Sequence, residues 1–173
     1  MRILLFLIFF CVFSFNSQAI NIAIFQYSEI LNNSTQYKEF QQELNNFKEK
    51  IFTDLKKDEE KLLKKKIEIE DSKILLTKSE YDTKTADFQI EKNNFELKID
   101  KYNSYIQSNI EFNEKIILDE ILIIVRNIAI EKKIDLVLNE NQYYLSSDDI
   151  NISNMIIQKL NETKLGLILK DFE

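Results

Sequence analysis

The feature that most constrains this fold is the stretch from Ser34 to Lys133, which contains neither glycine nor proline. Because these two residues are the usual breakers of helices, long helices are expected there. At the start of the stretch, apolar side chains recur at steps of three and four: Tyr37, Phe40, Leu44, Phe47, Ile51 and Leu55. This spacing places them on one face of a helix.

Two series with a seven-residue spacing follow. The first is Leu55, Leu62, Ile69 and Leu76, and the second is Tyr81, Phe88, Phe95 and Tyr102. A seven-residue repeat stays on one face only when helices wrap around each other, so the two segments are expected to pair as antiparallel arms. Between them, Thr77 and Glu80 match a capping box, which predicts a turn at residues 73–77 and a second helix starting at Thr77. One continuous helix through this point is the alternative.

The two ends of the predicted arms differ in composition. Polar side chains adjoin the seam near the tip, at Asp58, Lys65, Thr85 and Lys92. Residues 116–130 are instead apolar around most of the helix circumference, which is typical of a helix buried on several sides. We therefore expect a firm base and compliant tips.

Short strands are predicted on either side of the helices. Ile22–Phe25 is one, residues 135–138 are a second, and Gln142–Leu145 is a third that follows a turn at residues 139–141. Ser153 is expected to cap a last helix. In one chain, three short strands and an apolar helix base would leave much of their apolar surface and the strand edges exposed. Several copies are therefore expected to join their strands and helix bases in one shared body.

The predicted fold class is α+β, with a long antiparallel helical hairpin and a small β-strand oligomerisation body. Residues 34–116 form the hairpin, residues 20–33 and 117–161 form the body, and residues 162–173 form a tail of unknown role. The candidate body residues are apolar or aromatic: Ile22, Ile24, Ile117, Ile121, Ile124, Ile128, Leu136, Leu138 and Tyr144.

Residues 1–19 have the layout of a cleaved signal peptide. A basic Arg2 precedes an apolar run from Ile3 to Phe15, and small residues at Ser17 and Ala19 precede the expected cleavage site. An uncleaved membrane anchor is the alternative, but the run is shorter than the roughly 20 residues that a bilayer requires. No stable membrane insertion is expected after cleavage.

The composition of the mature chain excludes several function classes. Cleavage removes the only cysteine, Cys11, and the chain has no histidine, so no cofactor, soft-metal site or histidine-based catalysis is expected. Without Arg2, 22 basic residues face 29 acidic ones, a net charge of −7. This balance argues against nucleic acid or an anionic membrane surface as a partner.

Three segments of the chain resemble the Skp/OmpH family of periplasmic chaperones. They read IAIFQYSEILNNSTQYKEFQQEL, LTKSEYDTKTADFQ and IAIEKKIDLVLNENQYYLSSDDINISNMIIQKLN, and the last is the most specific. The resemblance implies a homotrimer whose helical hairpins enclose a cavity. It also implies an ATP-independent holdase that binds unfolded outer-membrane proteins in the periplasm and prevents their aggregation. Family members are often basic, whereas this chain is acidic.

Six apolar side chains away from the seam are candidates for client binding: Phe52, Leu63, Ile67, Ile74, Ile90 and Leu97. Ile67 and Ile74 each lie two residues before a seam position, which is about 200° around the helix. Scattered surface apolar residues are the alternative. For the protein as a whole, the rival functions are an exported coiled-coil spacer or adaptor with a sticky tip at Ile74–Leu76 and, more remotely, an enzyme.

Overall fold

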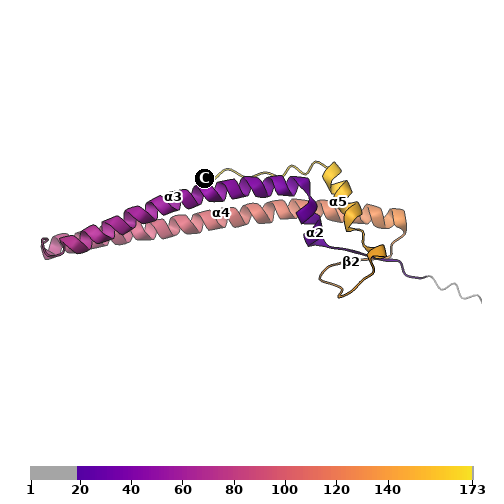
Figure 1. The fold of residues 1–173 in the computed structure, drawn as a ribbon, viewed down its shortest axis with the longest axis horizontal. Helices are drawn as coiled ribbons and strands as arrows, with labels where there is room; N and C mark the ends of the chain where they lie inside the picture. Colours follow the sequence, from indigo (N-terminus) through magenta and orange to yellow (C-terminus); the bar gives the residue numbers. More distant parts are fainter. Residues whose placement is uncertain (1–18, 173) are drawn as a thin grey trace, which may run out of the picture.

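The computed structural model describes residues 19–172. The predicted signal peptide therefore lies outside the described residues except for Ala19. Along the chain the elements are β1 (Ile22–Phe25), α2 (Tyr27–Asn33), α3 (Thr35–Ser72), α4 (Lys78–Lys132), β2 (Leu136–Asn139), the 3₁₀ helix η1 (Asp148–Ile150) and α5 (Ser153–Glu162). Figure 1 shows α3 and α4 as a long antiparallel hairpin, with the remaining elements gathered at its base.

The predicted break between the two long helices is confirmed, and the continuous-helix alternative is wrong. Thr77 caps α4 through a complete capping box: its hydroxyl accepts from the Glu80 amide at 3.3 Å, and its own amide donates to the Glu80 carboxylate at 2.9 Å. These bonds satisfy amides that the first turn of a helix leaves without partners. The turn at residues 73–77 therefore lies where the sequence indicated.

The seam between α3 and α4 is thin toward the tip, as predicted. On α3 the buried residues are Phe40, Leu44 and Ile51, followed only by Ile69 near the turn. On α4 the first buried residue is Asn109, which is 31 positions after the helix begins at Lys78. Apolar burial, the main stabilising contribution to helix pairing, is therefore concentrated at the base of the hairpin.

The strand prediction is confirmed in part. β1 pairs in parallel with β2, with Ile22 opposite Leu136 and Ile24 opposite Leu138. The other edge of β1 carries only a single bridge from Ile24 to Asn151. Asn21 holds the end of α4 against this sheet, because its side chain donates to the Lys133 carbonyl and its amide donates to Asp135, both at 2.9 Å.

The third predicted strand, Gln142–Leu145, is wrong for the single chain. Residues 139–142 form a tight turn in which the Gln142 amide donates to the Asn139 carbonyl at 2.9 Å, and the Gln142 side chain accepts from the Asn139 amide at 3.0 Å. A strand needs a neighbouring ladder for its backbone groups, and here the segment has none in the sheet of β1 and β2. Tyr144 and Leu145 are left fully exposed.

The role predicted for Ser153 is also wrong. Ser153 is the first residue of α5, and the N-cap position is taken by Ile152, which has no side chain that can cap. The Ser153 hydroxyl instead accepts from the Gln26 amide at 2.9 Å, while the Asn151 side chain accepts from the Ser153 amide at 2.9 Å. The hydroxyl therefore joins the start of α5 to the end of β1.

The core of the body packs α4 against β1, α2 and α5. One stripe of α4 is buried at steps of four, three and four, through Ile117, Ile121, Ile124 and Ile128. The opposite side of the same helix segment is exposed in the single chain, at Leu118, Leu122, Ile123 and Ile130. The expectation of a helix buried on several sides is thus not met within one copy. Of the other predicted body residues, Ile24 is buried, Leu138 is half-buried, and Ile22 and Leu136 are exposed.

Candidate functional site

The predicted client-binding residues are all exposed on the arms. Phe52, Leu63 and Ile67 lie on α3, and their separations of 11 and 4 residues put them within about 60° of one another around the helix. Ile90 and Leu97 lie on α4, seven residues apart, and so also share a face. The structure spreads these side chains along the arms rather than bringing them together.

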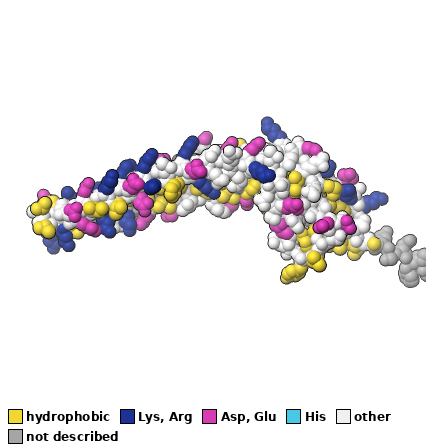
Figure 2. Space-filling model, viewed as in Figure 1, with side chains coloured by type: hydrophobic (Ala, Val, Ile, Leu, Met, Phe, Trp, Pro, Cys, Tyr) yellow, Lys and Arg dark blue, Asp and Glu magenta, His cyan; other side chains and the backbone are white. Residues whose placement is uncertain are grey.

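The tip of the hairpin is the most exposed apolar segment of the arms. Ile74 is 93% exposed, and the adjacent Leu75, which was predicted only as part of the adaptor tip, is 86% exposed. Figure 2 shows hydrophobic side chains at the tip and along the arm, interspersed with Lys, Asp and Glu. The apolar surface of the arms is thus divided by charged side chains into small patches, and small patches favour weak contacts over self-association.

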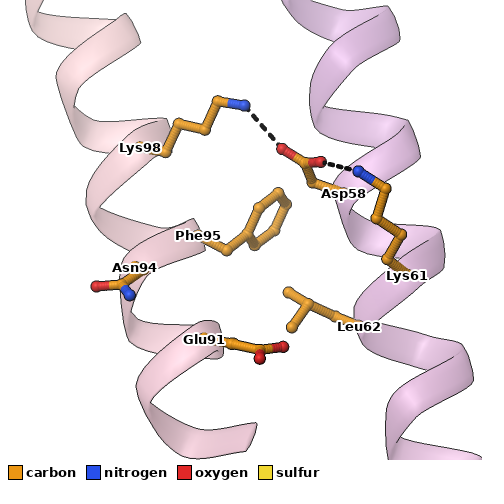
Figure 3. Close-up of a pocket in the computed structure, with 7 residues that line it drawn as sticks. All are labelled: Asp58, Lys61, Leu62, Glu91, Asn94, Phe95 and Lys98. Atoms are coloured by element: carbon orange, nitrogen blue, oxygen red, sulfur yellow. Dashed lines mark hydrogen bonds and ion pairs between the residues drawn. The ribbon is translucent and has the colours of Figure 1, made fainter. Parts of the chain in front are cut away.

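A hollow of about 260 Å³ lies in the seam halfway along the arms. Leu62 and Phe95 face each other across it, and charged side chains border it on both sides (Figure 3). Lys98 donates to Asp58 at 2.7 Å across the seam, and Lys61 donates to the same carboxylate at 3.0 Å. The hydrogen bond from Lys98, with a second from Lys61, holds the pKa of Asp58 below its ordinary value.

Ion pairs replace buried apolar side chains as links between the arms in this region. Lys65 pairs with Glu91 across the seam, in addition to the pair between Asp58 and Lys98. All four side chains are partly exposed, and such pairs contribute little free energy individually. At the polar seam positions, Asp58 and Lys65 therefore still link the two arms, but only weakly.

The tail after α5 runs back along the hairpin as an extended segment. Figure 1 shows it leaving α5 and following α3 toward the middle of the arm. Three amide side chains bind its backbone. Gln36 donates to the Thr163 carbonyl at 2.6 Å and accepts from the Leu165 amide at 2.9 Å.

The second and third amides are buried Asn residues on α4. Asn113 donates to the Ile168 carbonyl at 2.9 Å and accepts from the Ile168 amide at 3.0 Å. Asn109 accepts from the Lys170 amide at 2.8 Å, and the Tyr105 hydroxyl donates to the Lys170 carbonyl. The tail is thus held by its main chain, much as a strand is held by a neighbouring strand.

The end of the tail inserts into an aromatic cluster at Phe172. Its ring stacks on Tyr102 with centroids 4.6 Å apart, meets Tyr105 edge-on at 5.0 Å and lies 6.0 Å from Phe47. The Lys101 ammonium lies 5.1 Å from the Phe172 centroid. Burial, with a smaller contribution from Asp171, raises the pKa of Tyr105. We call the Gln36, Asn109 and Asn113 amides together with the Phe47, Tyr102 and Tyr105 rings the tail groove.

Sequence reasoning left the tail unplaced, although two signals pointed to the groove. Asn109 and Asn113 are four residues apart in a segment whose stripe is otherwise apolar, so they lie on one helix face and require polar partners. In the tail, apolar residues alternate at Leu165, Leu167 and Leu169, a pattern typical of an extended segment with one face covered.

Comparison with known proteins gives a consistent result. The family model described as "Outer membrane protein (OmpH-like)" matches residues 21–160. This chain belongs to the OmpH-like family. Among solved structures, it is similar to an OmpH-like protein from Caulobacter crescentus CB15, a candidate outer membrane chaperone, with a TM-score of 0.75 and 12% sequence identity. The match covers 91% of this chain and 94% of that one, so it shows a shared fold.

The family match ends before the tail, whereas the structural match covers a larger share of the chain. No curated protein matches the chain. The family model ends at residue 160, so the tail groove's occupant, residues 163–172, lies beyond it. Within residues 19–172 of this OmpH-like chain, no helix is long and apolar enough to cross a membrane, and no cluster of three or more His, Cys, Asp or Glu side chains could hold a metal ion.

Proposed function

We propose that this OmpH-like protein is an ATP-independent holdase chaperone of the periplasm that binds unfolded outer-membrane proteins and keeps them from aggregating. The proposal depends on one combined observation: the chain belongs to the OmpH-like family, and it exposes apolar side chains along two weakly joined arms. Such arms can make many weak contacts with polypeptides of varied sequence. The proposed activity needs no catalytic residue and no cofactor.

We also propose that three copies share their bases. Two observations support oligomerisation: the exposed apolar face of α4 at Leu118, Leu122 and Ile123, and the unpaired aromatic segment around Tyr144. A sheet of two short strands with free edges gains stability when strands from other copies extend it. In a trimer of this kind, three hairpins would project from one body and surround a client.

The decisive experiment dilutes a denatured outer-membrane β-barrel protein into buffer with and without this protein, without nucleotide, and follows light scattering. We expect scattering to be suppressed at a few copies of the chaperone per client. A coiled-coil spacer or adaptor, the rival suggested by the exposed tip at Ile74 and Leu75, would leave the scattering unchanged. Unchanged scattering from a folded protein would therefore reject the holdase proposal.

A further inference from the structure

The tail groove binds its occupant through the main chain. Gln36 and Asn113 each donate to a tail carbonyl and accept from a tail amide, and Asn109 accepts from a third amide. Every residue except proline offers the same amide and carbonyl groups. Recognition of this kind depends on an extended backbone and hardly on the sequence that carries it, as when a peptide adds to a sheet edge.

The tail lies on the groove as a shallow occupant. Along residues 163–170, half-buried and exposed residues alternate, with Leu165, Leu167 and Leu169 half-buried and Ile168 exposed. Lys170 is exposed too, but its ammonium lies over the Phe112 ring of α4, 3.6 Å from the centroid. None of residues 163–172 is fully buried. Beneath the tail, Asn109 and Asn113 are buried, and each also donates to a carbonyl of its own helix, at Tyr105 and Asn109, at 2.9 and 2.8 Å. The polar floor is therefore held in place by α4 itself, and the tail above it stays partly exposed to solvent.

Phe172 is the aromatic anchor of the occupant, in addition to Leu165 and Leu167, which pack against the core of the body. Phe172 meets the rings of Phe47, Tyr102 and Tyr105, with Lys101 beside it. Aromatic pairs in such stacked and edge-on geometries add to the free energy of burial. The groove thus combines a sequence-independent backbone ladder with a single socket for an aromatic side chain.

We propose that the tail groove is a binding site for an extended polypeptide segment that bears an aromatic side chain, and that the tail occupies it until a segment of an unfolded client replaces the tail. The inference rests on the proposed holdase function, which supplies the client. An unfolded outer-membrane β-barrel strand offers the required chemistry, an extended backbone with aromatic side chains. The tail competes from within the same chain, where effective concentrations reach the millimolar range. A weakly binding ligand therefore does not displace it, whereas an unfolded client that presents many such segments does.

The test uses the full-length protein and two fluorescein-labelled peptides, read by fluorescence anisotropy. The first peptide has the sequence of residues 163–172, and the second has the same sequence with its terminal Phe replaced by Ala. We expect the Phe172→Ala protein, whose tail has lost its anchor, to bind the first peptide at least about tenfold more tightly than the wild type does, since the competing state is depopulated. The Ala peptide should bind weakly to both proteins.

Groove variants and a second tail variant make the result specific. In the Phe172→Ala background, Asn113→Ala should abolish peptide binding, whereas Asn103→Ala, an exposed position on the same helix, should not. Gly166→Val loosens the tail at a different point, because residue 166 has a φ of 66°, which a β-branched residue adopts only with strain. It should raise the affinity for the peptide as Phe172→Ala does.

The decisive competitor is an extended peptide of unrelated sequence with a single Phe at its end, patterned after an outer-membrane β-strand. We expect it to displace the labelled tail peptide from the Phe172→Ala protein. If the folded variant binds no peptide, or if only the tail's own sequence binds, the groove serves this chain's tail alone, from the same or a second copy, and the proposal is overturned. Suppression of client light scattering by the wild-type protein tests the holdase function separately. Failure of the groove proposal can therefore be distinguished from failure of the holdase proposal.

Discussion

Asn113 binds both backbone polar groups of Ile168, donating to its carbonyl at 2.9 Å and accepting from its amide at 3.0 Å. The two residues are 55 positions apart, and the contact joins the chain's last segment to the middle of α4. An asparagine is suited to this position because its side chain carries a donor and an acceptor with the spacing of a backbone amide. The contact makes the tail part of the hairpin's structure.

Replacement of Asn113 by Ala should therefore lower the free energy of unfolding. The substitution removes two hydrogen bonds to the tail and leaves the Ile168 backbone to water, at a cost of about 1–3 kcal/mol. Urea unfolding followed by circular dichroism measures the change. Asn103→Ala, exposed on the same helix, is the matched control and should change stability by less than about 0.5 kcal/mol. Equal stabilities of the two variants would contradict the role given to Asn113.

The buried stripe of α4 should dominate the stability of the body. Ile121 is fully buried, and Ile121→Ala is expected to cost about 2–5 kcal/mol because it leaves a cavity in the core. Leu97→Ala, at an exposed position on the same helix, should cost less than about 0.5 kcal/mol. Thermal and urea unfolding of the two variants side by side would reveal whether the core lies where the structure has it.

The seam should weaken in acid through Asp58. Hydrogen bonds from Lys98 and Lys61 depress the folded-state pKa of this carboxyl below its ordinary value of 3.8. Their stabilisation is therefore fully present above the unfolded-state pKa and is lost as the pH falls through the lower, folded-state pKa. Asp58→Asn should be less stable than the wild type near neutral pH and should converge with it in acid.

Urea unfolding from about pH 6 down to about pH 2.5 measures this convergence. Glu59→Gln, an exposed carboxylate one residue away, is the control for the loss of a negative charge. A wild-type advantage over Asp58→Asn that stays constant across this range would show that the seam does not depend on the ionised Asp58.

The exposed face of the base should determine the oligomeric state. Leu122 is half exposed in the single chain, and Leu122→Glu would place a charge in the proposed interface between copies. We expect the mass in solution to fall from that of three chains to that of one, as measured by sedimentation or light scattering. Ser104→Glu, exposed further along α4, should leave the mass unchanged. A wild-type protein that stays folded as a single copy at low concentration would contradict the proposed trimer.

Client protection should depend on the exposed apolar side chains of the arms. Changing Ile67, Ile74, Ile90 and Leu97 to Ser together removes apolar contact area without touching the buried core. We expect suppression of light scattering to require several-fold more protein, while the oligomeric mass stays constant.

The matched control for this variant changes four exposed charged residues of the arms to Ser: Lys64, Glu68, Lys84 and Asp87. It introduces the same number of serines and leaves the net charge unaltered. If the variant that has lost the four apolar side chains protects clients as well as the wild type does, with its oligomeric mass unchanged, these residues are not the client site.

Local patterns in the sequence predicted the parts of the fold that depend on local physics. The seven-residue spacing and the Thr77–Glu80 pair placed the hairpin and its turn, because periodicity and capping act within one or two helical turns. The strand at residues 135–138 was one residue from the observed β2, whose partner Ile22–Phe25 was also predicted. The family resemblance was confirmed over residues 21–160.

Features set by distant contacts were missed. Gln142–Leu145 has the composition of a strand, but whether it forms one depends on a partner that the single chain does not supply. Ser153 resembles a helix cap, yet its hydroxyl is taken by Gln26, more than 120 positions earlier. The tail's position depends on Asn109 and Asn113, whose partners cannot be identified from helix periodicity. The six client-binding residues stay a prediction, since exposure alone does not establish contact.

The unbroken course of α4 has a mechanical consequence. A single rod of 55 residues runs from the turn of the hairpin into the centre of the body, whereas the apolar contacts of α3 become sparse beyond Ile51. Beyond Ile51, the arms are joined mainly by half-buried side chains and by the ion pairs of Lys65 with Glu91 and Lys98 with Asp58. A force that separates the arms there would therefore act first on these contacts and not on the buried core, which lies at the other end of the same rod.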